Sequence, residues 1–257
     1  MSIYLGMDIG ASRTKAAVID ENKNLIGHSV LHSGTDFGQT SERCAEAALK
    51  MAKGRMRDVV KTFATGYGRK NVPFASDTKT EIACHAAGCY HYFPEAITII
   101  DIGGQDNKII KVDDKGRRTN FMMNRKCAAG TGAFLEEMSM RLNIPLEDMN
   151  YLAPESTDMI KLGSYCTVFS ATEVLENITR GKKLPDIVKG LFYSVIKRVL
   201  EMDSLTEKVV MTGGVIAINP YIVNMTEEIT GKKILVPPLP QFTGAFGAAL
   251  FAIQETS

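Results

Sequence analysis

The sequence predicts an α/β protein made of two similar halves, each an antiparallel hairpin followed by helices and further strands. A repeat supports this prediction: Asp8-Ile9-Gly10 and the residues up to Asp20 align, without a gap at an offset of 93, with Asp101-Ile102-Gly103 and the residues up to Asp113. The 257 residues are 45% hydrophobic and 23% charged, which is typical of globular domains. Disordered and coiled-coil chains are therefore excluded.

Each half begins with an apolar run that ends at a polar turn bearing glycine, Ile3–Met7 in the first half and Ile97–Ile100 in the second. A second β-rich run follows each turn, and a third strand is predicted at Asn24–Leu31 and at Arg118–Met123. Helical composition and apolar periodicity predict helices over Thr40–Lys53, Thr131–Leu142, Ala171–Thr179, a longer segment from Pro185, and Thr243–Ile253. We expect two lobes across a cleft, residues 1–95 and 96–242, with residues 243–257 returning to the first.

The charge balance and the cysteine content indicate which partners and which thiol chemistry to expect. Thirty basic against 29 acidic residues leave a net charge of +1, so nucleic acid and anionic membranes are not expected partners. No apolar run reaches the roughly 20 residues of a membrane-spanning helix, and no export signal is apparent. Five cysteines, an odd number, favour reduced thiols, metal ligation or redox chemistry over disulfides. We expect a soluble cytoplasmic protein.

The first hairpin turn carries residue types that suit a phosphate chain. Gly10 lets the backbone approach an anion, and neighbouring N–H groups form an anion-binding nest. Ser12 and Thr14 add hydroxyl groups, and Lys15 adds a positive charge. Such turns are also common in hairpins without a ligand, so one turn alone is weak evidence.

Two further features strengthen this interpretation. Asp8 and Asp101 each precede a turn and would face each other across the cleft, where two carboxylates suit Mg²⁺. Thr212-Gly213-Gly214-Val215, echoed by Thr65-Gly66, would form a glycine floor for a nucleoside. Three glycine sites, two of them duplicated, predict a nucleotide-binding protein.

Together these sites resemble the acetate and sugar kinase, heat-shock chaperone and actin ATPase superfamily, whose fold is a duplicated ribonuclease H-like (actin-like) unit. The resemblance covers Asp8–Lys15, Asp101–Asp106 and Val210–Val215, and it implies that ATP or ADP binds between two lobes with Mg²⁺, which Asp8 and Asp101 hold through water. The nucleotide contacts implied in this way, with Gln241 as a loose carry-over, are Gly10, Ala11, Ser12, Arg13, Thr14, Lys15, Gly103, Gly104, Gly213, Gly214, Val215 and Gln241.

Gln105 is informative within the second turn. Superfamily members that phosphorylate alcohols commonly use a carboxylate as the general base, whereas glutamine cannot accept a proton but can orient a water molecule. We therefore assign Gln105 to the catalytic group with Asp8 and Asp101, and hydrolysis is favoured. Asp106, one residue further, keeps a kinase of small metabolites as an alternative.

Cys127 and Cys166 each precede a predicted helix, whose positive end favours a thiolate, the form that binds metal. Two thiolates of one chain cannot complete the four-cysteine ligation of a cubane cluster, but two chains related by a two-fold axis can. Spacing alone, 39 residues without a CxxC pair, favours two small buried residues instead.

A narrower resemblance reverses that preference. The stretches Asn124–Gly132, Ala64–Arg69, Glu81–Ala86, Ile100–Asp106 and Cys166–Phe169 are similar to signatures of the activator ATPases of 2-hydroxyacyl-CoA dehydratases and the ATPase subunits of benzoyl-CoA reductases. The similarity runs from Tyr4 to Ile253. It implies a homodimer that shares one [4Fe–4S] cluster, with Cys127 and Cys166 of each subunit as ligands.

The family resemblance also implies an activity and partners. A reduced ferredoxin or flavodoxin would supply an electron, ATP hydrolysis would drive lobe rotation, and a low-potential electron would pass to an iron–sulfur dehydratase or reductase. Helices that start just after the two cysteines would act as levers at the cluster. The alternatives are an acceptor of the double-cubane type, a cluster-free kinase, and a nucleotide-sensing scaffold with structural cysteines.

Several residues depart from these patterns. Arg13 stands where relatives more often carry a small residue or threonine, and we expect it to be solvated rather than bound to phosphate or a partner. Cys84 and Cys89 flank His85 in a spacing that metal sites also use, but an Ala-rich helix favours a structural interpretation. Cys44 is predicted to lie in the core.

Overall fold

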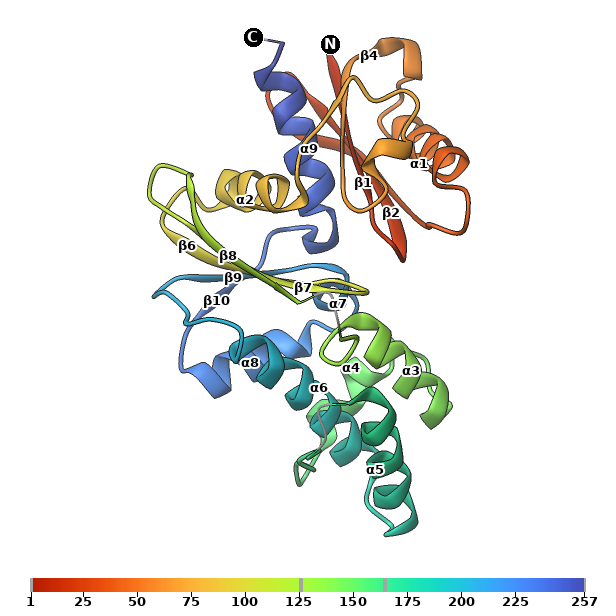
Figure 1. The fold of residues 1–257 in the computed structure, drawn as a ribbon, viewed down its shortest axis with the longest axis vertical. Helices are drawn as coiled ribbons and strands as arrows, with labels where there is room; N and C mark the ends of the chain where they lie inside the picture. The colour runs from red at the N-terminus through yellow and green to blue at the C-terminus, as the bar shows by residue number, and fades with distance from the viewer. Residues whose placement is uncertain (1, 125–126, 164–165, 257) are drawn as a thin grey trace. The chain divides into compact units, whose positions relative to one another are not determined.

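The computed structural model describes residues 2–124, 127–163 and 166–256 (Figure 1). Unit 1 comprises the chain up to Ala96, Lys111–Thr119 and the residues from Gln241 onward, and unit 2 comprises Ile97–Ile110 and Asn120–Pro240. The two five-stranded sheets have the same arrangement, β3-β2-β1-β4-β5 and β8-β7-β6-β9-β10. This equivalence confirms the duplicated α/β fold that the repeat predicts.

The sheet of unit 1 is built around its first strand. β1 pairs antiparallel with β2, with Ile9 opposite Thr14, and parallel with β4, with Asp8 opposite Thr65. Both hydrogen-bonding edges of β1 are therefore used, and its end lies inside the sheet. The strands of this sheet are β1 (Ile3–Ile9), β2 (Arg13–Asp20), β3 (Leu25–His32), β4 (Val59–Thr65) and β5 (Asp77–Thr78).

Helices cover both faces of this sheet. They are α1 (Phe37–Met51), α2 (Glu81–Tyr92) and α9 (Thr243–Gln254). Successive side chains of a strand point to opposite faces, so Leu5 and Met7 pack with α1 residues such as Leu49, whereas Tyr4 packs with Phe246 of α9. Asp8 shares its face with Tyr4, which directs its carboxylate to the side of the sheet that α9 covers.

The second sheet contains β6 (Ile97–Ile102), β7 (Asn107–Val112), β8 (Arg118–Asn124), β9 (Val209–Thr212) and β10 (Ile234–Leu235). β9 pairs parallel with both β6 and β10, with Asp101 opposite Thr212. Adjacent strands joined by a turn as short as 103–106 run antiparallel, so β6 and β7 form the predicted second hairpin.

A helical layer packs on one face of the second sheet. Its core joins strand residues such as Ile100 and Ile109 to Phe134, Leu191 and Val195. The helices are α3 (Gly132–Leu142), α4 (Met149–Leu152), α5 (Thr167–Thr179), α6 (Leu184–Leu200), α7 (Gly214–Ile218) and α8 (Tyr221–Thr230). Short 3₁₀ turns lie at Met56–Asp58, Arg69–Asn71, Ala153–Glu155 and Pro240–Phe242. Among the described residues, no helix combines the length and hydropathy that crossing a membrane requires.

The tip of the β7–β8 hairpin belongs to unit 1 by its contacts. The hydroxyl of Tyr90, on α2, donates a 2.8 Å hydrogen bond to the carbonyl of Asp114. A Cβ on Gly116 would lie 2.9 Å from the Tyr90 ring, and the glycine φ of +75° is a conformation that other residues rarely adopt. Glycine at this position therefore lets the hairpin tip close on α2.

Helix boundaries differ from the sequence prediction where periodicity is a poor guide. α1 begins at Phe37, three residues before the predicted start, because the Asp36 side chain accepts a hydrogen bond from Gln39 N and caps the helix. α5 begins at Thr167 rather than at Ala171. Its first turn includes exposed apolar residues, so the burial pattern used for prediction starts only after that turn.

The close approach of α9 to β1 generates a stability prediction. A Cβ on Gly6 would overlap the carbonyl oxygen of Ala245 and lie 2.5 Å from Ala249 N. We expect Gly6→Ala to lower the free energy of unfolding by about 1–3 kcal/mol in urea denaturation, because the helix backbone must move away. Gly38→Ala is the matched control. Its Cβ would meet only ordinary contacts of 3.4 and 3.5 Å, and equal losses in both variants would contradict the packing argument.

Candidate functional site

The first hairpin turn joins β1 to β2 and is braced by Ser33. Gly10 N donates to Arg13 O over 3.1 Å, and Ser33 N donates to Ser12 O over 3.0 Å. Ser33 Oγ donates to the Gly10 carbonyl at 2.6 Å and pairs with the Thr14 hydroxyl at 2.9 Å. The Thr14 hydroxyl, predicted as a phosphate contact, thus has a protein partner and supports the turn from inside.

Asp8 forms a buried ion pair across this hairpin. Its register partner on β2 is Lys15, whose Nζ donates to Asp8 Oδ2 over 3.0 Å. Asp8 Oδ1 is buried and has no hydrogen-bond partner among the described residues. Because such an oxygen loses its hydration without compensation, it fits an acceptor for a metal-bound water or another ligand.

The second turn repeats the first at the predicted offset of 93. Gly103 N donates to Asp106 O over 2.9 Å, as Gly10 N does to Arg13 O. Lys108 Nζ donates to Asp101 Oδ2 over 2.9 Å, as Lys15 does to Asp8, and also to Asp106 Oδ1 over 2.7 Å. The Lys108 side chain is only 1% exposed, compared with 17% for Lys15. The second pair is therefore more completely removed from water.

The third glycine site is duplicated as well. Gly66, after β4, has φ of +88°, and a Cβ there would lie 2.6 Å from Asp8 Oδ1. Gly213, after β9, has φ of +104°, and a Cβ there would lie 2.6 Å from Asp101 Oδ1. Only glycine allows this conformation together with contact to the carboxylate. The loop after each parallel strand is thus packed directly on the aspartate of its hairpin.

The segment after β9 is held by Pro240 and is partly exposed at Gly214. The Thr212 hydroxyl and Gly213 N both donate to the carbonyl of Pro240, at 2.5 and 3.1 Å. A Cβ on Gly214 would meet no described atom within 4 Å, so the space beside this residue is open. Val215 is buried at the start of α7.

Gln105 occupies the exposed part of the second turn. Asp106, by contrast, has its carboxylate engaged by Lys108. This ion pair weakens the case for Asp106 as the base of a kinase.

The remaining predicted nucleotide contacts lie on the surface or near it. Ala11 is exposed, whereas Ser12, Arg13, Gly104 and Gln241 are half-buried. The predicted contacts at residues 8–15 and Gln241 belong to unit 1. The predicted contacts at residues 101–105 and 213–215 belong to unit 2.

Cys127 is exposed and begins a hydrogen-bonded loop that leads to α3. Asn124 Nδ2 donates to the Cys127 carbonyl over 3.2 Å, and the Thr131 hydroxyl donates to Ala128 O over 2.6 Å. α3 begins at Gly132, so four residues separate Cys127 from the helix predicted to follow it directly. The signature residues Arg125 and Lys126 lie outside the described residues.

Cys166 is also exposed and precedes α5 directly. Ser170 N donates to the Cys166 carbonyl over 2.8 Å, which makes this cysteine the residue that opens the helix. Val168 and Phe169 in the first turn are 70% and 65% exposed. Ser164 and Tyr165, which precede Cys166 in the predicted motif, lie outside the described residues.

The other three cysteines are buried. Burial raises the pKa of the Cys44 thiol to about 11 and that of the Cys84 thiol to about 12. These thiols therefore stay protonated at neutral pH and are poor metal ligands. In the described part of the chain, neither Cys84 nor Cys89 joins His85 in a group of three metal-binding side chains.

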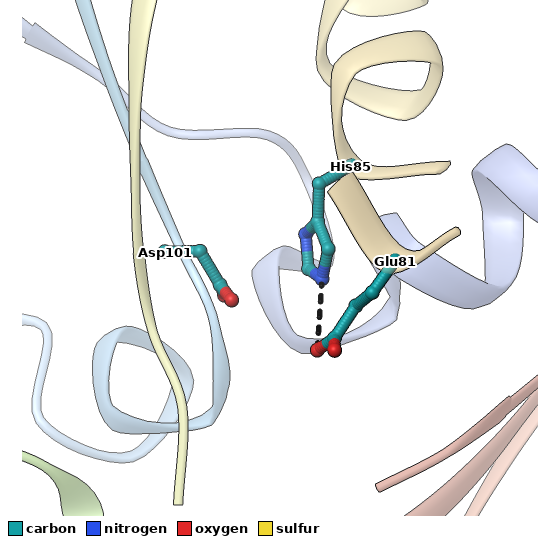
Figure 2. A group of neighbouring side chains, drawn as sticks. All are labelled: Glu81, His85 and Asp101. Atoms are coloured by element: carbon teal, nitrogen blue, oxygen red, sulfur yellow. Dashed lines mark ion pairs between the residues drawn. The ribbon is translucent and has the colours of Figure 1, made fainter. Parts of the chain in front are cut away.

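His85, which is not among the predicted site residues, lies on α2 near Gly244. Glu81 and His85 lie one turn apart on α2, with Glu81 Oε1 3.9 Å from His85 Nε2 (Figure 2). The Thr243 hydroxyl lies 3.3 Å from His85 Nδ1. A Cβ on Gly244 would lie 3.0 Å from His85 Nε2 and 3.2 Å from Asp8 Oδ2, so the imidazole and the Asp8 carboxylate both border this glycine. The residues around His85 in the sequence do not indicate that Gly244 lies next to its side chain.

Comparison with known proteins identifies close relatives. The profile of the BadF/BadG/BcrA/BcrD ATPase family matches residues 5–252. The chain is 41% identical over 253 residues to the activator of lactoyl-CoA dehydratase from Anaerotignum propionicum. This alignment covers 97% of each of the two proteins.

Solved structures give the same result. The chain matches component A of (R)-2-hydroxyglutaryl-CoA dehydratase from Acidaminococcus fermentans with a TM-score of 0.94 and 37% identity, over 99% of each chain. It matches the activator of 2-hydroxyisocaproyl-CoA dehydratase from Clostridium difficile, with bound ADPNP, with a TM-score of 0.92 and 36% identity, over 98% of this chain and 95% of that one. A glucokinase of the ROK family from Streptomyces griseus, 15% identical with a TM-score of 0.57 over 98% and 99%, shares the actin-like fold alone.

The two duplicated ion pairs generate a prediction because they differ in burial. We expect Lys108→Met to lower the free energy of unfolding by about 3–5 kcal/mol, since Asp101 would lose this partner in a buried site. Lys15→Met is expected to cost less, because water reaches that pair. Urea denaturation followed by circular dichroism measures both losses.

Lys182→Met is the surface control for this comparison. The pair of Lys182 with Asp158, at 3.6 Å, is largely exposed, and its loss should change stability by less than about 1 kcal/mol. A loss for Lys15→Met equal to or greater than that for Lys108→Met would contradict the role assigned to burial.

Proposed function

The chain belongs to the BadF/BadG/BcrA/BcrD ATPase family, and we propose that it is the ATP-driven electron donor of an iron–sulfur enzyme that acts on a CoA ester. The acceptor would be a 2-hydroxyacyl-CoA dehydratase or an enzyme related to benzoyl-CoA reductase. The names of the relatives support the acceptor class, since they are activators of dehydratases with 36–41% identity over nearly the whole chain. The chain is an ATPase, and electron transfer is the further step proposed.

The observation that carries this proposal is the exposure of two cysteines out of five. Cys127 and Cys166 are exposed, whereas Cys44, Cys84 and Cys89 are buried. Two accessible thiols per chain fit half of a four-cysteine cluster, which a two-fold dimer would complete. We therefore propose a homodimer with one [4Fe–4S] cluster. When bound, the cluster supplies a one-electron carrier between a ferredoxin or flavodoxin and the acceptor enzyme.

The nucleotide contacts are proposed on the duplicated turns. Backbone groups of the first turn, Gly10–Lys15, and of Gly103 and Gly104 in the second would hold the phosphates, and Gly213–Val215 would support the adenosine. Asp8 and Asp101 would hold Mg²⁺ through water, and the buried oxygen of Asp8 fits this role because it has no hydrogen-bond partner among the described residues. When bound, Mg²⁺ neutralises phosphate charge.

Gln105 is proposed to orient the water that attacks the terminal phosphate. Its amide can donate to and accept from a water molecule, but it cannot take the proton. Its exposed place in the turn supports this role, as does the ion pair that occupies its neighbour Asp106. This pair of side chains supports hydrolysis rather than transfer to an alcohol.

Iron analysis tests the cluster assignment. On protein purified without oxygen, we expect about four irons and four acid-labile sulfides per dimer, with a reducible optical chromophore. Cys127→Ala and Cys166→Ala should each abolish iron binding, because each removes two of the four ligands of a dimer. Cys44→Ala, which removes a buried thiol, is the matched control and should keep its iron.

Two outcomes would oppose this assignment. A full cluster in either exposed-cysteine variant would exclude that residue as a ligand. Absence of iron after attempted reconstitution, together with phosphoryl transfer to a sugar or an acid, would instead support a kinase.

Kinetics test the role of Gln105. We expect Gln105→Ala to lower the rate of ATP hydrolysis by about 100-fold, because misplacing the attacking water is costly, while the nucleotide dissociation constant changes much less. Gln39→Ala, an exposed glutamine of α1, serves as the control. Unchanged turnover in Gln105→Ala would remove the water-orienting role.

A further inference from the structure

We propose that Asn107 is a positioning residue that couples the second phosphate turn to the loop carrying Cys127. Asn107 is the first residue of β7, immediately before Lys108, and it is 1% exposed. Its Nδ2 donates a 2.7 Å hydrogen bond to the carbonyl of Gly130. The inference rests on the proposed function, because it assumes that nucleotide binds at the second turn and that Cys127 acts at the electron-transfer site.

The loop end that Asn107 holds is tightly constrained. Gly130 has φ of +89°, and a Cβ there would lie 3.4 Å from Asn107 Nδ2 and 3.1 Å from the Arg198 side chain. Thr131 closes the same loop by hydrogen bonds from its N–H and hydroxyl to Ala128 O, at 3.0 and 2.6 Å. A displacement of Gly130 is therefore passed along a loop that has little freedom to absorb it.

Two backbone hydrogen bonds join the same loop to the turn itself. Gly132 N donates to Gly103 O over 2.9 Å, and Ala133 N donates to Gly104 O over 2.8 Å. The start of α3 is thus bound to the carbonyls of the glycines proposed to hold phosphate. Asn107 adds a side-chain hydrogen bond to these two backbone hydrogen bonds. Substitution of Asn107 removes the side-chain bond alone, and so measures how much that bond contributes to the coupling.

The repeat gives an independent argument for this role. The residue equivalent to Asn107, at the offset of 93, is Thr14, whose hydroxyl pairs with Ser33 and braces its own turn. In the unit that contains Cys127, the same position carries a longer amide that reaches outside the turn. Asn107 Oδ1 has no hydrogen-bond partner among the described residues, so within this part of the chain the bond from Nδ2 to Gly130 O is the one that orients the amide.

Hydrogen exchange read by mass spectrometry tests this proposal on the full chain purified without oxygen. The probe is the Mg²⁺ complex of ADPNP, whose binding is titrated separately. We expect the analogue to slow exchange of residues 127–133 by about fivefold or more, the usual scale of coupling between sites. In Asn107→Ala this change should fall below about twofold, with analogue affinity little altered.

Two further variants sharpen the test. Asn107→Leu keeps a similar side-chain shape and removes the amide without adding a charge, so it replaces Asn107→Ala if that variant does not fold. Asn150→Ala removes another amide from unit 2, one that accepts a 2.8 Å bond from Tyr221 N, and should keep the full response.

The outcomes separate this inference from the proposed function. Analogue binding without any change at residues 127–133 would overturn the coupling alone, as would a full response in both Asn107 variants. Failure of the analogue to bind the parental chain would overturn the nucleotide site and the coupling together. Iron content, measured on the same samples, reports on the cluster independently of either result.

Discussion

The site depends on one interaction that occurs twice, a lysine–aspartate pair buried across the first hairpin of each unit. A buried carboxylate requires a partner, and the hairpin register places Lys15 opposite Asp8 on the neighbouring strand. Lys108 holds Asp101 in the same way. The glycine after the parallel strand then packs against the same carboxylate. One aspartate thus sets the position of two backbone segments in each unit.

The two copies of this arrangement have diverged in what they connect. In unit 1, Thr14 and Ser33 bond to each other, so the turn is braced within its own sheet. In unit 2, the turn carbonyls accept hydrogen bonds from the start of α3, and Asn107 reaches the loop before it. Of the two turns proposed to bind nucleotide, the one in unit 2 is consequently joined to the loop of the exposed Cys127.

The cysteines divide by the chemistry of their surroundings. Cys44 and Cys84 lie among core side chains, where burial raises their pKa values and leaves uncharged thiols that act as small apolar groups. Cys127 and Cys166 lie in exposed segments that precede helices. Both exposed thiols therefore belong to unit 2, and they are the ones proposed as cluster ligands.

The sequence by itself determined the repeat, the two hairpins and the glycine turns, because these depend on residues close together in the chain. It also determined the family, since the motifs around Cys127 and Cys166 are contiguous. Only the tertiary structure decided that the hydroxyl of Thr14 is hydrogen-bonded to Ser33. It also decided that Gln105 is exposed while Asp106 forms an ion pair. The hydrogen bonds from the start of α3 to Gly103 and Gly104 are a third such result. The physical reason is that these partners are brought together by sheet pairing and helix packing, and backbone groups, which form several of the bonds, have no signature in an amino-acid sequence.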